Sequence, residues 1–183
     1  MNKILNVKRK DLINSYYNYA AGYYESGIDL IDILLNEKRY CELPNSFRKE
    51  AIKLEEENRI YPIMFLFRQY IELMIKALYL QFEIKIDKDS CEKVFNDHSF
   101  KNIWPDLKRK LEEQENENSE LTGLVDIISE TVDFFMYLDN ESYNYRYPTN
   151  KALQFYLKEN QKYDLDNIKS MVKNFDEYIH YFI

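Results

Sequence analysis

Glycine and proline are scarce in this chain, whose 183 residues include three glycines and four prolines. β-Strands must be joined by frequent turns, and turns favour Gly, Pro, Asn and Asp. The scarcity therefore predicts an all-α fold, a single helical bundle of about five to six helices that forms one domain over residues 1–183. The segment 153–163 leaves room for one short strand or hairpin within this bundle.

Apolar residues recur at spacings of three and four along most of the chain, as on amphipathic helices. Ser46 and Ser99 are suited to cap helix starts, and Pro62 suits the first turn of the central helix, where its missing N–H is not needed. Pro105 predicts a 3₁₀ or kinked start for the helix that follows Ser99. Helices are expected at about 11–36, 46–57, 61–82, 99–114, 121–138 and 165–182.

The predicted central helix carries three charged residues in one line, within the most apolar run of the chain. Arg68, Glu72 and Lys76 are four residues apart and share one helical stripe with several aromatic residues. Glu72 can pair with both cations, which leaves one net positive charge. The stripe is either a narrow solvated face or a polar site inside the bundle that could hold a phosphate or order a polar loop.

A second group of polar and aromatic residues lies in the sequence SYNYRYPTN, where Arg146 stands between Tyr145 and Tyr147. A guanidinium beside aromatic rings suits a phosphate, a carboxylate or a stacked base. The alternative is a structural arginine that bridges two loops, because arginine also packs on tyrosine for stability.

His98 lies at a predicted helix start between Asp97 and Ser99, where it is a candidate general acid or base or a hydrogen-bonding surface residue. His180 is expected to pack near the C-terminus. The two histidines are far apart and the two cysteines form no CxxC pair, so no metal site is predicted. The chain also lacks the glycine-rich loops that cradle phosphates, so no cofactor is expected.

The net charge of −7 disfavours whole-surface attraction to nucleic acid or to an anionic membrane, although it permits a local basic pocket. No apolar run reaches membrane-spanning length without charge, and the N-terminal sequence lacks the apolar region of a signal peptide. We therefore expect a soluble cytoplasmic protein without membrane association. The tyrosine-rich helices at both ends offer more apolar surface than a small bundle covers, which predicts a homodimer.

The sequences FRQYIELMIKAL, DHSFKNIWPDL and YRYP, which lie within Ile60–Thr149, resemble the HEPN superfamily of small helical bacterial and archaeal proteins. The resemblance implies two kinds of function. Many HEPN proteins are dimeric, metal-independent ribonucleases that act as toxins or antiviral effectors, and others are non-catalytic partners of nucleotidyltransferases.

A ribonuclease of this kind, in a defence or toxin–antitoxin system, would take its cation from Arg146 and Arg68 and its acid or base from His98. Glu72, Lys76, Tyr145 and Tyr147 would contribute to binding RNA or another nucleotide. The usual HEPN signature places a histidine one to two turns after an arginine, whereas Arg146 is followed by YPTNKAL. The alternatives are therefore a non-catalytic binding module or partner subunit with an antitoxin or nucleotidyltransferase, and a helical adaptor unrelated to nucleotides.

Overall fold

The computed structural model describes residues 9–36, 43–82, 94, 98–149, 152–154 and 163–183. These residues form an all-α bundle, as predicted, and contain no strand. Residues 155–162, most of the segment in which a strand or hairpin was left open, lie outside the described residues. The α-helices are α1 (Arg9–Leu35), α2 (Asn45–Phe82), α4 (Trp104–Glu117), α5 (Leu124–Asp139) and α6 (Leu165–Ile179), with 3₁₀ turns η3 (Phe100–Asn102), η4 (Ser119–Leu121) and η5 (His180–Phe182).

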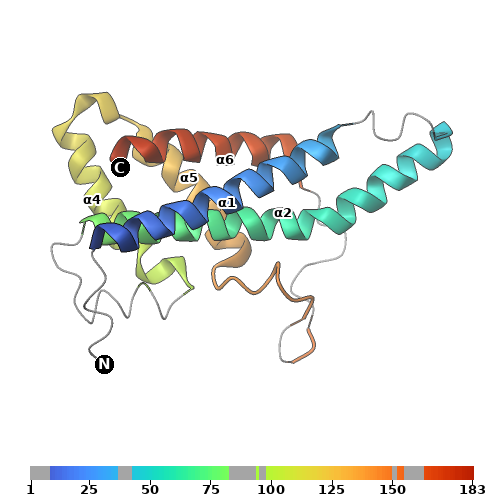
Figure 1. Ribbon diagram of the computed structural model, residues 1–183, viewed down its shortest axis with the longest axis horizontal. Helices are drawn as coiled ribbons and strands as arrows, with labels where there is room; N and C mark the ends of the chain where they lie inside the picture. The colour runs from blue at the N-terminus through green and yellow to red at the C-terminus, as the bar shows by residue number, and fades with distance from the viewer. Residues whose placement is uncertain (1–8, 37–42, 83–93, 95–97, 150–151, 155–162) are drawn as a thin grey trace.

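Helix α2 is the central element of the bundle. It runs antiparallel to α1 along most of the length of α1, while α6 packs against both α1 and α5 (Figure 1). Helix α4 contacts α2 and α5 at the end of the bundle that contains the C-terminal half of α2. Most apolar residues of α2 from Ile60 to Leu80 contribute to one core.

The long contact between α1 and α2 depends on Gly27, where the two helices approach closely. A β-carbon at this position would lie 2.4 Å from Cε1 of the buried Phe67 ring. Only a glycine leaves room for that ring, so Gly27 is a packing residue although it weakens the intrinsic helix propensity. Helix α1 continues without interruption through both Gly22 and Gly27.

The predicted boundary before Pro62 is wrong. We expected a short helix to end near Glu57 and the central helix to begin at Tyr61, but α2 is one helix from Asn45 to Phe82 with Pro62 inside it. Proline removes the helical hydrogen bond to the carbonyl of Asn58. Asn58 and Pro62 are both exposed, so water can hydrate this carbonyl and the helix continues.

The start of α4 agrees with the sequence prediction. Ser99 caps η3, since its Oγ accepts a hydrogen bond from the backbone N–H of Lys101 at 3.2 Å, and Pro105 lies in the first turn of α4. Helix α5 begins at Leu124 rather than Leu121, because Gly123 has a φ of 84° that separates it from the preceding 3₁₀ turn.

A buried tyrosine joins α2 to α6. The Tyr70 hydroxyl donates a hydrogen bond to Asp176 Oδ1 at 2.6 Å, and its ring packs edge-on against Phe175. Burial, together with this hydrogen bond to the Asp176 carboxylate, raises the pKa of Tyr70 well above its ordinary value, so the hydroxyl remains a donor.

Among the helices of the described ranges, none combines the length and the apolar character that a membrane span requires.

Candidate functional site

The charged stripe on α2 is buried, which decides between the two alternatives. Arg68, Glu72 and Lys76 are 0%, 4% and 5% exposed. Arg68 Nη1 donates to Glu72 Oε2 at 2.6 Å, and Lys76 Nζ donates to Glu72 Oε1 at 2.7 Å. The predicted double pairing of Glu72 is thus confirmed, and the stripe is not a solvated face.

Arg68 holds the end of α5 against α2. Its Nε donates to the carbonyl of Asp139 at 2.8 Å, and its Nη2 donates to the carbonyls of Asn140 at 3.1 Å and His98 at 2.5 Å. The last carbonyls of a helix lack helical partners and carry the negative end of its dipole, so a cation is favourable there. The guanidinium also stacks on Phe100, with Cζ 3.9 Å from the ring centroid. Arg68 therefore orders a polar loop, one of the roles considered for the stripe.

Glu72 lies at the centre of this buried cluster and accepts hydrogen bonds from three side chains. Besides Arg68 and Lys76, Nδ1 of His98 lies 3.0 Å from Glu72 Oε1. Burial by itself would raise the pKa of Glu72, but the charges of Arg68 and Lys76 and the hydrogen bonds from Lys76 and His98 lower it below its ordinary value. Glu72 is therefore ionised at neutral pH.

His98 is the accessible member of the cluster, with a side chain that is 54% exposed. A carboxylate only accepts hydrogen bonds, so Nδ1 of His98 must donate to Glu72. This hydrogen bond fixes the ring orientation and, in the neutral imidazole, leaves Nε2 unprotonated. A carboxylate-oriented imidazole with an accessible second nitrogen is suited to general acid–base chemistry.

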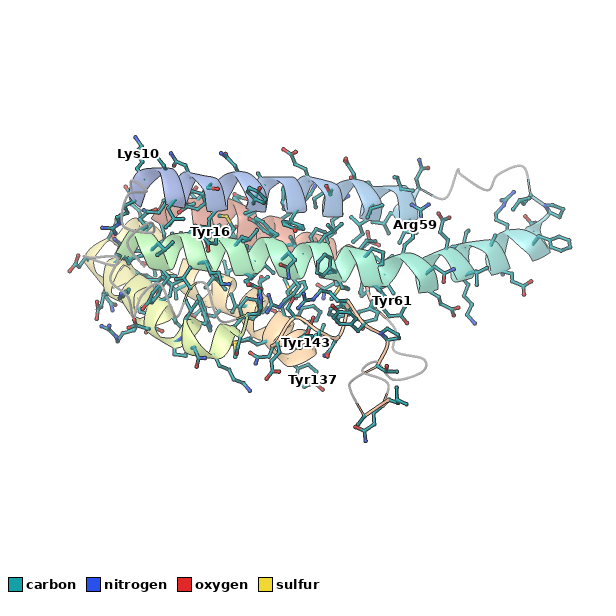
Figure 2. The ribbon with its side chains drawn as sticks, turned by 60° about the horizontal axis from the view of Figure 1, so that its bottom comes forward. Lys10, Tyr16, Arg59, Tyr61, Tyr137 and Tyr143 are labelled. Carbon is teal, nitrogen blue, oxygen red and sulfur yellow. The ribbon has the colours of Figure 1, made fainter. Side chains whose placement is uncertain are left out.

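Arg146, Tyr145 and Tyr147 lie in the loop that follows α5. The Arg146 side chain donates through Nε to the carbonyl of Ser142, and its guanidinium lies 5.2 Å and 5.8 Å from the ring centroids of Tyr143 and Tyr147. Figure 2 shows Tyr143 below α2, on the same side as Tyr61. An open pocket of about 460 Å³ on this side is lined by Pro62, Phe65, Tyr145, Arg146 and Tyr147.

The predicted site residues thus form two neighbouring groups. Arg68, Glu72, Lys76 and His98 form the buried cluster, whereas Arg146, Tyr145 and Tyr147 line the pocket. Residues 139–142 connect the groups, because Arg68 binds their first carbonyls and Arg146 binds the last. Along α2, the pocket residue Phe65 and Glu72 are seven residues apart, which corresponds to about 10 Å of helix.

Sequence reasoning missed the residues that connect the two groups. Asp139 Oδ1 accepts hydrogen bonds from the backbone N–H groups of Tyr143 and Asn144 at 2.8 and 3.1 Å, and so shapes the loop. Gln69 Nε2 donates to Ser142 Oγ at 2.7 Å, which fixes the loop to α2. The sequence feature that could have indicated the role of Asp139 is the Asp–Asn pair at the end of an apolar helix. Both residue types favour local hydrogen bonds to backbone N–H groups.

The described part of the chain contains no group of three or more His, Cys, Asp or Glu side chains that could hold a metal ion. Comparison with known proteins adds no family: no protein-family model, no curated protein and no solved structure matches this chain.

Proposed function

We propose that this chain is a HEPN-like intracellular protein that cleaves RNA without a metal ion, in a bacterial defence or toxin–antitoxin system, with His98 as the proton-transfer group. The observation that carries the proposal is the half-exposed His98 imidazole held at 3.0 Å by the buried, ionised Glu72. Holding a histidine in one tautomer on a buried carboxylate prepares it for proton transfer.

The proposed reaction uses the 2′-hydroxyl of RNA as the nucleophile. Nε2 of His98 removes the 2′-hydroxyl proton, the 2′-oxygen attacks the adjacent phosphorus, and the bond from phosphorus to the 5′-oxygen breaks. The 5′-oxygen takes a proton from water, and the His98 imidazolium returns its proton to the solvent. The products are a 2′,3′-cyclic phosphate and a 5′-hydroxyl end. Charge that develops on the phosphate oxygens requires a cation nearby.

Arg146 is the cation that suits this role, because its guanidinium is exposed beside the pocket and next to tyrosines on which a base could stack. We assign Arg68 a different role from the expected cation, because it is fully buried and donates to three backbone carbonyls. In this proposal Arg68 and Lys76 keep Glu72 ionised and in place. The partner is RNA or another nucleotide, and the protein works as a homodimer in the cytoplasm.

A non-catalytic binding module is the second candidate function. It is favoured by the burial of Arg68 and by the hydrogen bond of Arg146, whose Nε donates to the carbonyl of Ser142 rather than to His98 or Glu72. In this reading the cluster stabilises the fold, and the aromatic pocket beside Arg146 binds a nucleotide or a partner protein such as an antitoxin or a nucleotidyltransferase.

The test is cleavage of varied RNA substrates in the presence of a metal chelator by wild type, His98→Ala, His180→Ala and Arg146→Ala. His180 is the matched control, because it is also a half-exposed histidine whose Nδ1 is hydrogen-bonded, in this case to a backbone carbonyl. We expect His98→Ala to lose about 100-fold or more in rate while it melts as a folded protein, and His180→Ala to keep wild-type activity.

If wild type leaves all RNA substrates intact, with and without cellular extract, the ribonuclease proposal fails. RNA or nucleotide binding that is lost in Arg146→Ala would then favour the binding module. If Arg146→Ala and His98→Ala both unfold, these residues have a structural role only.

A further inference from the structure

The first turns of α2 extend beyond the rest of the bundle. Gly27 of α1 lies level with Phe67 of α2, and the two helices are antiparallel, so Leu35 at the end of α1 lies level with Arg59. The segment Asn45–Asn58, which we call the arm, therefore continues past α1, as Figures 1 and 2 both show. No other helix of the described chain lies beside the arm in either view.

One face of the arm, continued by the next turn of α2, carries large apolar side chains that are exposed. Phe47, Leu54 and Tyr61 are seven residues apart and are 65%, 59% and 42% exposed. Seven residues complete almost two helical turns, so these side chains form one line. A single exposed apolar residue needs no explanation, but a line of three on an unsupported helix is typical of an interface between helices.

The charges of the arm are divided between its two halves. The first half carries Arg48, Lys49 and Lys53 with one glutamate, whereas residues 55–58 contain three glutamates. The helix dipole favours acidic residues near the N-terminus, and the first turn of α2 has none. The helix dipole therefore does not favour this charge order, although Lys53 and Glu57 pair along the helix at 3.6 Å. Most of the stability of a helix in a protein comes from packing, and the arm has no helix packed against it in the described chain.

We propose that the arm pairs with the arm of a second copy of this chain, antiparallel about a two-fold axis near Leu54. This arrangement places Leu54 against the partner's Leu54 and Phe47 against the partner's Tyr61. It also sets the basic half of each arm beside the acidic half of the other, whereas a parallel pair would place like charges together. The contact uses the same surface on both copies, as a closed two-fold dimer requires.

The pairing has a consequence for the pocket. Tyr61 is adjacent to Pro62, which lines the pocket together with Phe65 and Arg146. The partner's Phe47 would lie beside Tyr61 and would therefore reach the edge of the pocket. This interface stands independently of the ribonuclease proposal, because it rests on the arm alone.

The first test measures molar mass by light scattering at micromolar concentration. Wild type is expected at twice the 22.3 kDa of the chain, and the double variant Phe47→Asp/Leu54→Asp at 22.3 kDa with an unchanged far-ultraviolet circular dichroism spectrum. Tyr137→Asp is the matched control, because Tyr137 is an exposed aromatic residue on α5, away from the arm. This variant should remain dimeric. A monomeric wild type, or a double variant that remains dimeric, would overturn the proposal.

The second test exchanges the charges of the arm. Lys49→Glu/Lys53→Glu makes both halves acidic, and Glu55→Lys/Glu57→Lys makes both halves basic. Each variant alone is expected to be monomeric, and an equimolar mixture of the two is expected to form the dimer. Failure of the mixture to associate would overturn the pairing of the arms, and single variants that remain dimeric would overturn its antiparallel arrangement.

Discussion

Replacement of Glu72 by alanine tests whether the buried cluster stabilises the fold. The substitution removes the carboxylate that Arg68, Lys76 and His98 share and leaves two cations at positions that are 0% and 5% exposed. Removal of one member of a buried ion pair costs about 3–5 kcal/mol, because the remaining charge has lost its counter-charge in a poorly solvated place. A solvated stripe would lose about 0.5 kcal/mol or less.

The assay is urea unfolding followed by far-ultraviolet circular dichroism, with linear extrapolation to water. The control is Glu113→Ala, which removes a glutamate that pairs with Arg109 on the surface of α4, and it should leave the unfolding midpoint unchanged. A Glu72→Ala protein whose free energy of unfolding lies within about 1 kcal/mol of wild type would show that the cluster does not stabilise the fold, because an uncompensated buried charge costs more than that.

Two further predictions concern acid stability and the contact between α1 and α2. Folding lowers the pKa of Glu72 below its ordinary value of 4.5. The ionised carboxylate therefore contributes its full stabilisation above about pH 4.5, and this stabilisation is lost as the pH falls through the lower pKa of the folded state. The difference in unfolding free energy between wild type and Glu72→Gln should therefore narrow in acid, and urea titrations that give a constant difference down to the acid transition would contradict this. Gly27→Ala should destabilise the protein by about 1–3 kcal/mol, because its new methyl group overlaps the Phe67 ring. Gly22→Ala meets no atom within 4 Å and should stabilise by about 0.5–1 kcal/mol, so thermal melts in which both variants shift the same way would contradict the packing described here.

The sequence predicts the pairing within the charged stripe but not its surroundings. Residues four apart on a helix are neighbours by local geometry, so the contacts of Glu72 with Arg68 and Lys76 follow from spacing. The contact of Glu72 with His98 spans 26 residues, and that of Arg68 with the carbonyl of Asp139 spans 71. These contacts depend on how the helices pack, and helical spacing alone contains no information about that.

The helix boundaries show the same division between local and long-range causes. Ser99 and Pro105 predict a capped 3₁₀ start for α4 because both act on their own turn. Pro62 led to a wrong helix boundary, because proline removes a hydrogen bond from any helix that contains it. The cost of that loss is reduced where the freed carbonyl is hydrated, and the sequence does not show which carbonyls are exposed. The packing role of Gly27 could not be predicted from the sequence either. It depends on the ring of Phe67, which is 40 residues away along the chain and lies near Gly27 only in the packed structure.

Rescue of His98→Ala by free imidazole tests whether the His98 ring transfers the proton. If the His98 ring transfers the proton, the variant leaves a surface site beside Glu72 that added imidazole can enter, since the native ring is half exposed. The proposed function predicts that His98→Ala cleaves RNA slowly and that imidazole raises its rate, with no effect on the rate of His180→Ala. A wild type that cleaves RNA while imidazole fails to raise the rate of a folded His98→Ala variant, or a wild type that cleaves no RNA, would contradict it.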